Sequence, residues 1–162
     1  MDGGSRHASG QAHGATLRSG SAGGPVWQSV EELTSRARML LHAGETEEAG
    51  RMLRLVLQRD ARVAEAQYLQ GMLQLSTGRL ADALASFEQV VRLDETHLMA
   101  GLQVVVLLGR TGRIAEAEAQ RARLAALVAT RGDDEVIDDE QGITIGFIRL
   151  VCATTGQTLA AS

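Results

Sequence analysis

The sequence predicts an all-α fold of three stacked helical hairpins, and two observations carry that prediction. Glycine recurs at Gly44, Gly78 and Gly112, each 34 residues after the last, and an alanine preceded by an acid follows each glycine five residues later. A period of 34 residues is typical of tandem helix-turn-helix units. The single proline, Pro25, lies ahead of the whole periodic region, so no proline interrupts a helix there.

The first 28 residues differ in composition from the rest of the chain. They are rich in glycine and serine, and such a segment buries too little apolar surface to offset the entropy of ordering it. We therefore expect residues 1–28 to form a disordered tail. Ser29 and Glu32 then match the capping-box pattern Ser-x-x-Glu, which predicts that the first helix begins directly after Ser29.

Three repeats are predicted, over residues 30–62, 63–96 and 97–131. In each, the central glycine can take the left-handed conformation that ends the first helix, and in the first repeat Thr46 is the expected cap of the second helix. The last helix, predicted over residues 114–130, is less regular. Its Arg121 stands where the earlier repeats have Leu53 and Phe87, which indicates the polar outer face of an array end.

The 34-residue pattern ends at Arg131. Residues 133–140 hold six acids in eight positions, so we expect 132–142 to be an acidic linker. Residues 143–162 form an apolar C-terminal segment, whose β-branched stretch 143–151 predicts a short strand or a capping helix. A lone strand is not stable by itself. We expect this segment to dock on the exposed end of the third hairpin, where Ile114, Leu124 and Val128 need a neighbour, or to fold back into the groove.

Charge and composition exclude several functions. A net charge of −4 argues against a nucleic-acid binder, and the absence of lysine excludes a P-loop and Schiff-base chemistry. The longest apolar run, residues 98–108, is too short to span a bilayer. A single cysteine, Cys152, cannot form an internal disulfide, which suits the cytoplasm. The four histidines and Cys152 lack the spacing of a metal or catalytic site, so we expect no enzyme activity, cofactor or metal.

The spacing resembles the tetratricopeptide repeat, a helix-turn-helix unit that stacks into a right-handed superhelix. The small and aromatic positions of that family fall here on Ala37, Ala49 and Leu53 in the first repeat, on Gly71, Ala83 and Phe87 in the second, and on Ala117 in the third. The chain departs from the family pattern at Gln67, Gln74 and Glu95, which replace its tryptophan, tyrosine and proline, and Val105 replaces a small residue. The resemblance covers about residues 30–131.

The resemblance implies a ligand groove on the concave face, lined by the first helix of each hairpin. The predicted partner-binding residues follow helical spacing and are Thr34, Arg38, Leu41, Glu65, Tyr68, Met72, Leu75 and Met99. Glu31, Leu102 and Val106 belong to the same stripes, with Leu102 and Val106 expected to be buried rather than exposed to a ligand. For Tyr68 and Met72, contact with a partner and burial between repeats both remain open. The family's carboxylate clamp is not expected, because Thr34 and Arg38 take its positions.

The predicted function is a non-catalytic scaffold that binds a peptide or helix of a partner protein in the groove. Two alternatives stay open: a bacterial secretion-type chaperone for apolar export substrates, and a regulatory or truncated part of an enzyme. An array with an exposed apolar end could also pair with a second copy as a homodimer.

Overall fold

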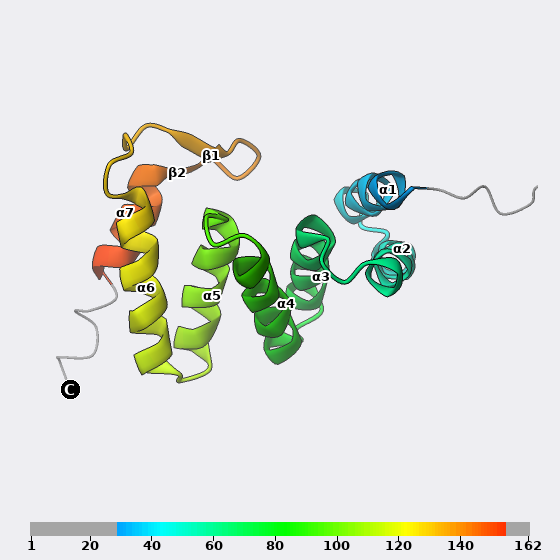
Figure 1. Cartoon of the computed structure of the whole chain (residues 1–162), viewed down its shortest axis with the longest axis horizontal. Coiled ribbons are helices and arrows are strands. Elements are labelled where there is room, and N and C mark those ends of the chain that lie inside the picture. Colours follow the sequence, from blue (N-terminus) through cyan, green and yellow to red (C-terminus); the bar gives the residue numbers. More distant parts are fainter. Residues whose placement is uncertain (1–28, 155–162) are drawn as a thin grey trace, which may run out of the picture.

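A computed structural model describes residues 29–154 of the chain. Within this range the helices are α1 (Val30–His42), α2 (Thr46–Arg59), α3 (Ala64–Ser76), α4 (Leu80–Leu93), α5 (Leu98–Arg110), α6 (Ile114–Val128) and α7 (Ile145–Thr154), and the strands are β1 (Val136–Asp138) and β2 (Ile143–Thr144). The helices follow one another along an elongated array, with α7 and the strands at its C-terminal end (Figure 1). The predicted tail, residues 1–28, and the last residues of the apolar segment, 155–162, lie outside the described range.

The helix boundaries follow from local chemistry. The capping box is confirmed: the Ser29 hydroxyl accepts the N–H of Glu32 at 3.1 Å, and the Glu32 carboxylate accepts the N–H of Ser29 at 2.9 Å. Gly44, Gly78 and Gly112 have φ angles of 78°, 75° and 74°, the left-handed region that glycine adopts at low cost. The prediction of Thr46 as a cap was wrong. Helix α2 begins at Thr46 itself, because the tight turn at Gly44 brings the chain into helical geometry one residue earlier.

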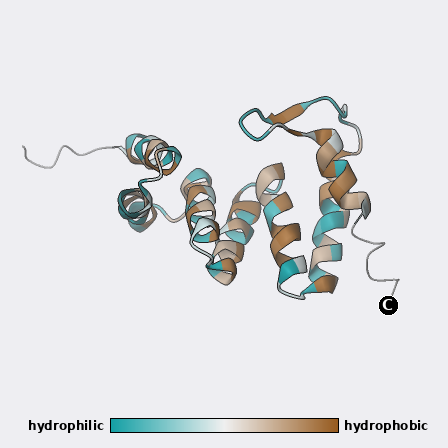
Figure 2. Ribbon diagram, turned by 180° about the vertical axis from the view of Figure 1, so that it is seen from behind, coloured by the Kyte–Doolittle hydropathy of each residue, from teal (hydrophilic) through white to brown (hydrophobic). Residues whose placement is uncertain are grey.

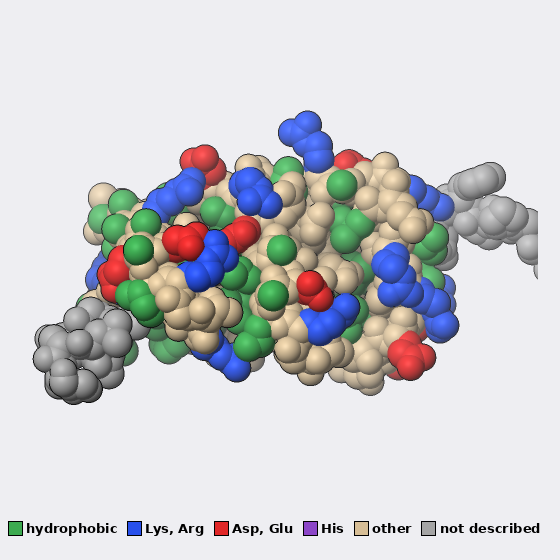
Figure 3. All heavy atoms as spheres, turned by 90° about the horizontal axis from the view of Figure 1, so that it is seen from below, with side chains coloured by type: hydrophobic (Ala, Val, Ile, Leu, Met, Phe, Trp, Pro, Cys, Tyr) green, Lys and Arg blue, Asp and Glu red, His purple; other side chains and the backbone are tan. Residues whose placement is uncertain are grey.

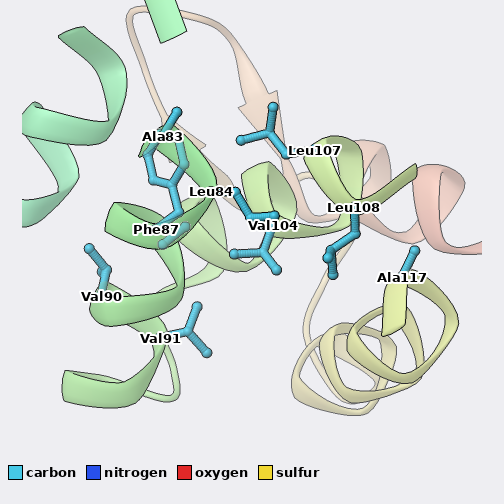
Figure 4. Packing of buried hydrophobic residues seen from close by; sticks show 10 residues of the cluster. Ala83, Leu84, Phe87, Val90, Val91, Val104, Leu107, Leu108 and Ala117 are labelled. Atoms are coloured by element: carbon cyan, nitrogen blue, oxygen red, sulfur yellow. The ribbon is translucent and has the colours of Figure 1, made fainter. Parts of the chain in front are cut away.

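Three clusters of buried apolar side chains hold the hairpins together. The central cluster joins α4 to α5 and α6 and includes the fully buried Phe87 (Figure 4). A first cluster joins α1, α2 and α3 around Leu53 and Val56. In the second hairpin a Cβ at Gly71 would lie 2.8 Å from the Phe87 ring, so only glycine allows α3 and α4 to approach this closely. The expected pairing of a small residue with this aromatic ring is therefore confirmed.

The third cluster closes the C-terminal end of the array. Ile145 and Ile148 of α7 are fully buried against Leu124 and Val128 of α6. The expected docking of the apolar segment on the third hairpin is therefore confirmed, and it caps the array as a helix. The expectation was wrong for Ile114, which keeps 39% of its surface exposed and does not belong to this cluster.

The acidic segment is more structured than a plain linker. Its residues form β1, which pairs antiparallel with β2 of the apolar segment. The expected strand and the expected capping helix thus both exist, in adjacent parts of one segment. We call residues 136–144 the hairpin arm. In Figure 2 its β1 strand is hydrophobic and its turn is hydrophilic.

Arg121 does not lie on a polar outer face, as the sequence suggested. It is 6% exposed, and its guanidinium pairs with Glu118 at 2.5 Å. Its position is therefore internal, like those of the matching Leu53 and Phe87 in the earlier repeats, and is not part of a polar outer face.

Candidate functional site

The candidate site is a groove of about 630 Å³ beside the first helices of the first two hairpins. Helices α1 and α3 form two of its walls, and the turn of the hairpin arm forms a third. Its lining residues are Arg38, Leu41, His42, Ala64, Glu65, Tyr68, Leu69, Met72, His97, Asp138, Glu140 and Gln141. In Figure 1 the arm extends over α5 toward α3 and α1, and the Glu140 side chain near its tip lies 3.7 Å from His42 of the first hairpin.

The floor of the groove is apolar and centred on Tyr68. Its ring packs edge-on against Phe87, with ring centroids 5.5 Å apart, and lies 5.1 Å from the ring of His97. His97 is oriented by the start of α5, because its Nδ1 accepts the N–H of Ala100 at 3.1 Å. Leu41 and Met72 are half-buried on either side. The floor therefore offers apolar contact area that the core holds in place.

The rim of the groove is charged. Arg38 of α1 and Glu65 of α3 form an ion pair across it. Nδ1 of His42 lies 3.7 Å from a carboxylate oxygen of Glu140 in the arm. Burial raises the pKa of the Tyr68 phenol, and the nearby negative charge of Asp138 raises it further. The arm therefore brings two carboxylates to the edge of an apolar floor.

Not every predicted partner-binding residue lies in this groove. Arg38, Leu41, Glu65, Tyr68 and Met72 line it. Thr34 is buried, and its hydroxyl donates to the carbonyl of Val30 at 2.7 Å. Leu75 is half-buried against the central cluster, and Met99 is only 7% exposed.

The third repeat contributes least to the groove, which corrects the expectation for its first helix. Met99 and Leu102 are buried because α5 lies between α4 and α6, with α7 and the arm over its remaining side. Leu102 is buried as expected, in contact with the α7 cluster. Val106 was also expected to be buried, but 42% of its surface is exposed. The groove therefore ends near His97.

Sequence reasoning missed the groove residues contributed by the arm and by the ends of helices. Asp138, Glu140 and Gln141 were assigned to a linker, and His42 and His97 to helix ends without a role. An acidic segment carries no local signal for where it docks. The apolar segment that follows it was the only indication in the sequence. Because that segment must pack against the array, it also determines where the preceding acidic residues lie.

Other chemistry has little support in residues 29–154. No group of three or more His, Cys, Asp or Glu side chains in this range is arranged to hold a metal ion. Burial raises the pKa of the Cys152 thiol, although nearby Arg121 acts in the opposite direction. A raised pKa reduces the thiolate fraction that a nucleophile needs. Within the same range, no helix has the length and apolar character to cross a membrane.

The surface charges do not gather into a basic stripe on the face shown in Figure 3. Arginine and acidic side chains stand next to one another there, with apolar atoms between them. Charged residues of the chain also pair with neighbours three positions away in sequence, for example Arg51 with Glu48 and Arg113 with Glu116. Such a mixed face is typical of solvated helices.

Comparisons with known proteins agree with the repeat pattern. No protein-family model matches the chain. A tetratricopeptide repeat and J domain-containing co-chaperone of Cryptococcus neoformans is 28% identical over 124 residues, which are 76% of this chain and 23% of the relative. The chain therefore spans about a quarter of the length of that relative.

Two solved structures share the arrangement of helices. The type III secretion chaperone SycD of Yersinia enterocolitica, in complex with a peptide of the translocator YopD, matches with a TM-score of 0.60 at 18% identity, over 76% of this chain and 91% of that chain. YrrB, described as a TPR protein with an unusual peptide-binding site, matches with a TM-score of 0.55 at 17% identity, over 64% of this chain and 54% of that chain. The chain has the helical-repeat fold of tetratricopeptide-repeat proteins.

Proposed function

We propose that the chain is a non-catalytic scaffold that binds an apolar segment of a partner protein in the groove between α1, α3 and the hairpin arm. The observation that carries the proposal is the floor formed by Leu41, Tyr68 and Met72, which is apolar, open and held by the core. Methionine and tyrosine offer large contact area and adapt to different partner side chains. A groove between helices accepts either a helix or an extended strand.

Proteins with a similar fold support this proposal. SycD was solved with a peptide of YopD, and YrrB is described by its peptide-binding site. The C. neoformans relative is a co-chaperone, although only about a quarter of it corresponds to this chain. A fold used for peptide binding in such proteins, together with an open apolar groove here, favours the same use.

A secretion-type chaperone is the second candidate. The SycD match covers 76% of this chain and 91% of that chain, so the shared arrangement of helices extends over most of both aligned chains. In this role the groove would protect an apolar segment of an export substrate. A partner encoded beside this gene with an apolar export segment would support it, and a partner that is never exported would argue against it.

The test of the proposal is a selection of peptides from a random 12-residue library displayed on phage, against the immobilised full chain. Selected peptides are then measured by fluorescence anisotropy against the wild type and the double variant Tyr68→Ala/Met72→Ala. We expect binding to weaken about tenfold or more, because truncated anchors at the centre of an interface carry most of its binding energy.

The control for this test removes apolar side chains elsewhere. Met39→Ala/Leu55→Ala truncates two exposed side chains outside the groove, 66% and 42% exposed, and should bind like the wild type. Because Tyr68 also packs on Phe87, Met72→Gln serves as a milder groove variant that keeps the side-chain length. Unchanged binding by both groove variants would rule out the proposed site, and so would failure of the wild type to select any peptide.

A role as part of an enzyme, a homodimer and a cytoplasmic location are further proposals. A part of an enzyme is the third alternative, and proteins with this array followed by a catalytic domain would favour it. A homodimer could form through Phe147 and Leu150, two exposed apolar side chains of α7, and light scattering would show its mass. A cytoplasmic location rests on the single cysteine of the chain.

A further inference from the structure

The hairpin arm is anchored at its base and exposes its charges at its tip. The Arg149 guanidinium of α7 donates to the carbonyls of Val128 and Arg131 at 2.8 Å and 2.9 Å and pairs with Asp133. Ile137 and Ile143 of the arm also pack against the cluster that joins α5, α6 and α7. These contacts hold the base of the arm in place, and the turn residues extend from it to the groove.

The charges around the groove do not balance. Arg38 and Glu65 compensate each other, and His97 uses its Nδ1 as an acceptor for the N–H of Ala100. Asp138 and Glu140 remain on the arm. Within residues 29–154 the one ion pair found for Glu140 is with His42, which is charged only when it is protonated. Of the charges lining the groove, the two acids of the arm are therefore left in excess.

Of the two acids, Asp138 gives the stronger indication that a cationic group binds here. It is half-buried beside the apolar floor, and one of its oxygens accepts the N–H of Gln141 at 3.0 Å. None of the ion pairs found within residues 29–154 includes Asp138. A carboxylate that is partly removed from water without a cation is unfavourable, and a cationic group supplied from outside would offset that cost.

We infer that the carboxylates of the hairpin arm select partner segments that carry a lysine or arginine beside their apolar residues. The apolar side chains would lie on the floor around Tyr68 and Met72, and the basic side chain would point to Asp138 and Glu140. This inference rests on the proposed function and adds the chemistry of the ligand to it. The arm then supplies specificity, while the helices supply most of the contact area.

The experiment uses peptides selected on the full wild-type chain and their versions with each lysine or arginine replaced by glutamine. Both sets are measured by fluorescence anisotropy against the wild type and Asp138→Asn/Glu140→Gln. The matched control is Asp134→Asn/Asp139→Asn, which removes the same charge from the same acidic segment at residues that do not line the groove. Circular dichroism melting checks that each variant is folded.

We expect the glutamine versions to bind the wild type and the control variant about 3- to 10-fold more weakly than the parent peptides, in line with one or two partly exposed ion pairs. Against Asp138→Asn/Glu140→Gln, parent and glutamine peptides should bind equally. Selected peptides without basic residues, or an equal loss against all three proteins, would overturn the inference and leave the groove proposal standing. If the wild type selected no peptide, the proposed function would fail and the inference with it.

Discussion

At the scale of single residues, the second repeat shows how a glycine sets the distance between two helices. Gly71 lies under the Phe87 ring, and Phe87 in turn supports Tyr68 on the groove floor. A side chain at position 71 would push on this ring and so on the floor above it. The packing of the core and the shape of the groove therefore depend on the same contact.

Replacing Gly71 by alanine should destabilise the protein by about 1–3 kcal/mol, because the added Cβ would lie 2.8 Å from the Phe87 ring. Urea unfolding followed by circular dichroism measures the change. Gly109→Ala is the control, since that helical position has no atom within 4 Å of an added Cβ. There alanine should stabilise by about 0.5–1 kcal/mol. Equal effects at both sites would contradict the packing described for Phe87.

Tyr68 provides a direct probe of the arm, because it is the only tyrosine of the chain. Its pKa should lie above the ordinary value, first through burial and second through Asp138. Absorbance at 295 nm during an alkaline titration reports this pKa alone. In Asp138→Asn the pKa should fall but stay raised, since burial remains. An unchanged pKa in that variant would show that the arm does not lie against Tyr68 in solution.

The same shift has a consequence for stability. With the pKa raised in the folded state, the unfolded chain ionises first as the pH rises. The contribution of Tyr68 to stability is therefore complete below the ordinary tyrosine pKa of about 10 and is lost progressively above it. The direction would reverse only if the folded-state pKa were the lower of the two.

At the scale of elements, α7 and the hairpin arm complete the array. A chain that ends at Arg131 would expose Leu102, Leu124 and Val128, which α7 now covers. We expect this truncation to cost about 3 kcal/mol or more, given roughly 1.5–3 kcal/mol for each large apolar side chain. Thermal melting and solubility measure the loss. A chain that ends at Thr154 is the control, and equal melting of the two truncated chains would argue against a capping role.

The helical hairpins could be predicted from the sequence because their signals are local. The turn glycines and the capping box at Ser29 act within one or two turns of chain, and Gly71 faces Phe87 across a single hairpin, within one repeat. The path of the arm could not be predicted in the same way. It depends on Arg149 reaching the end of α6, a contact between residues far apart in sequence. The burial of Arg121 was not predicted either, because spacing alone does not tell whether a polar side chain at that position is exposed.

In the candidate site, too, the residues that follow a local pattern could be predicted, and those placed by tertiary contacts could not. Arg38, Glu65, Tyr68 and Met72 follow helical spacing, and so the repeat pattern placed them on the concave face. Met99 follows the same spacing but is buried, because spacing does not tell which neighbours cover a helix. Asp138 and Glu140 line the groove because the arm packs against the rest of the array, and no local sequence pattern indicates this packing.

At the scale of the whole molecule, the array uses its two ends for one site. The first two hairpins supply the floor of the groove, and the C-terminal arm returns to supply the third wall. The third hairpin lies between the first two hairpins and the arm and contributes mainly to the core. Its helix α5 is the most completely buried of the described helices. A partner bound in the groove would therefore contact parts of the chain that are about 100 residues apart, from Arg38 to Glu140.

The most direct test of this account is site-specific photo-crosslinking of a selected, fluorescently labelled peptide. A photoreactive phenylalanine derivative replaces Glu65, which is exposed on the groove wall, or Leu55, which is exposed on α2 outside the groove. The account predicts that the peptide crosslinks at position 65 and not at position 55, and that excess unlabelled peptide abolishes the crosslink. Equal labelling at both positions, or labelling at position 55 alone, would contradict a groove-binding scaffold.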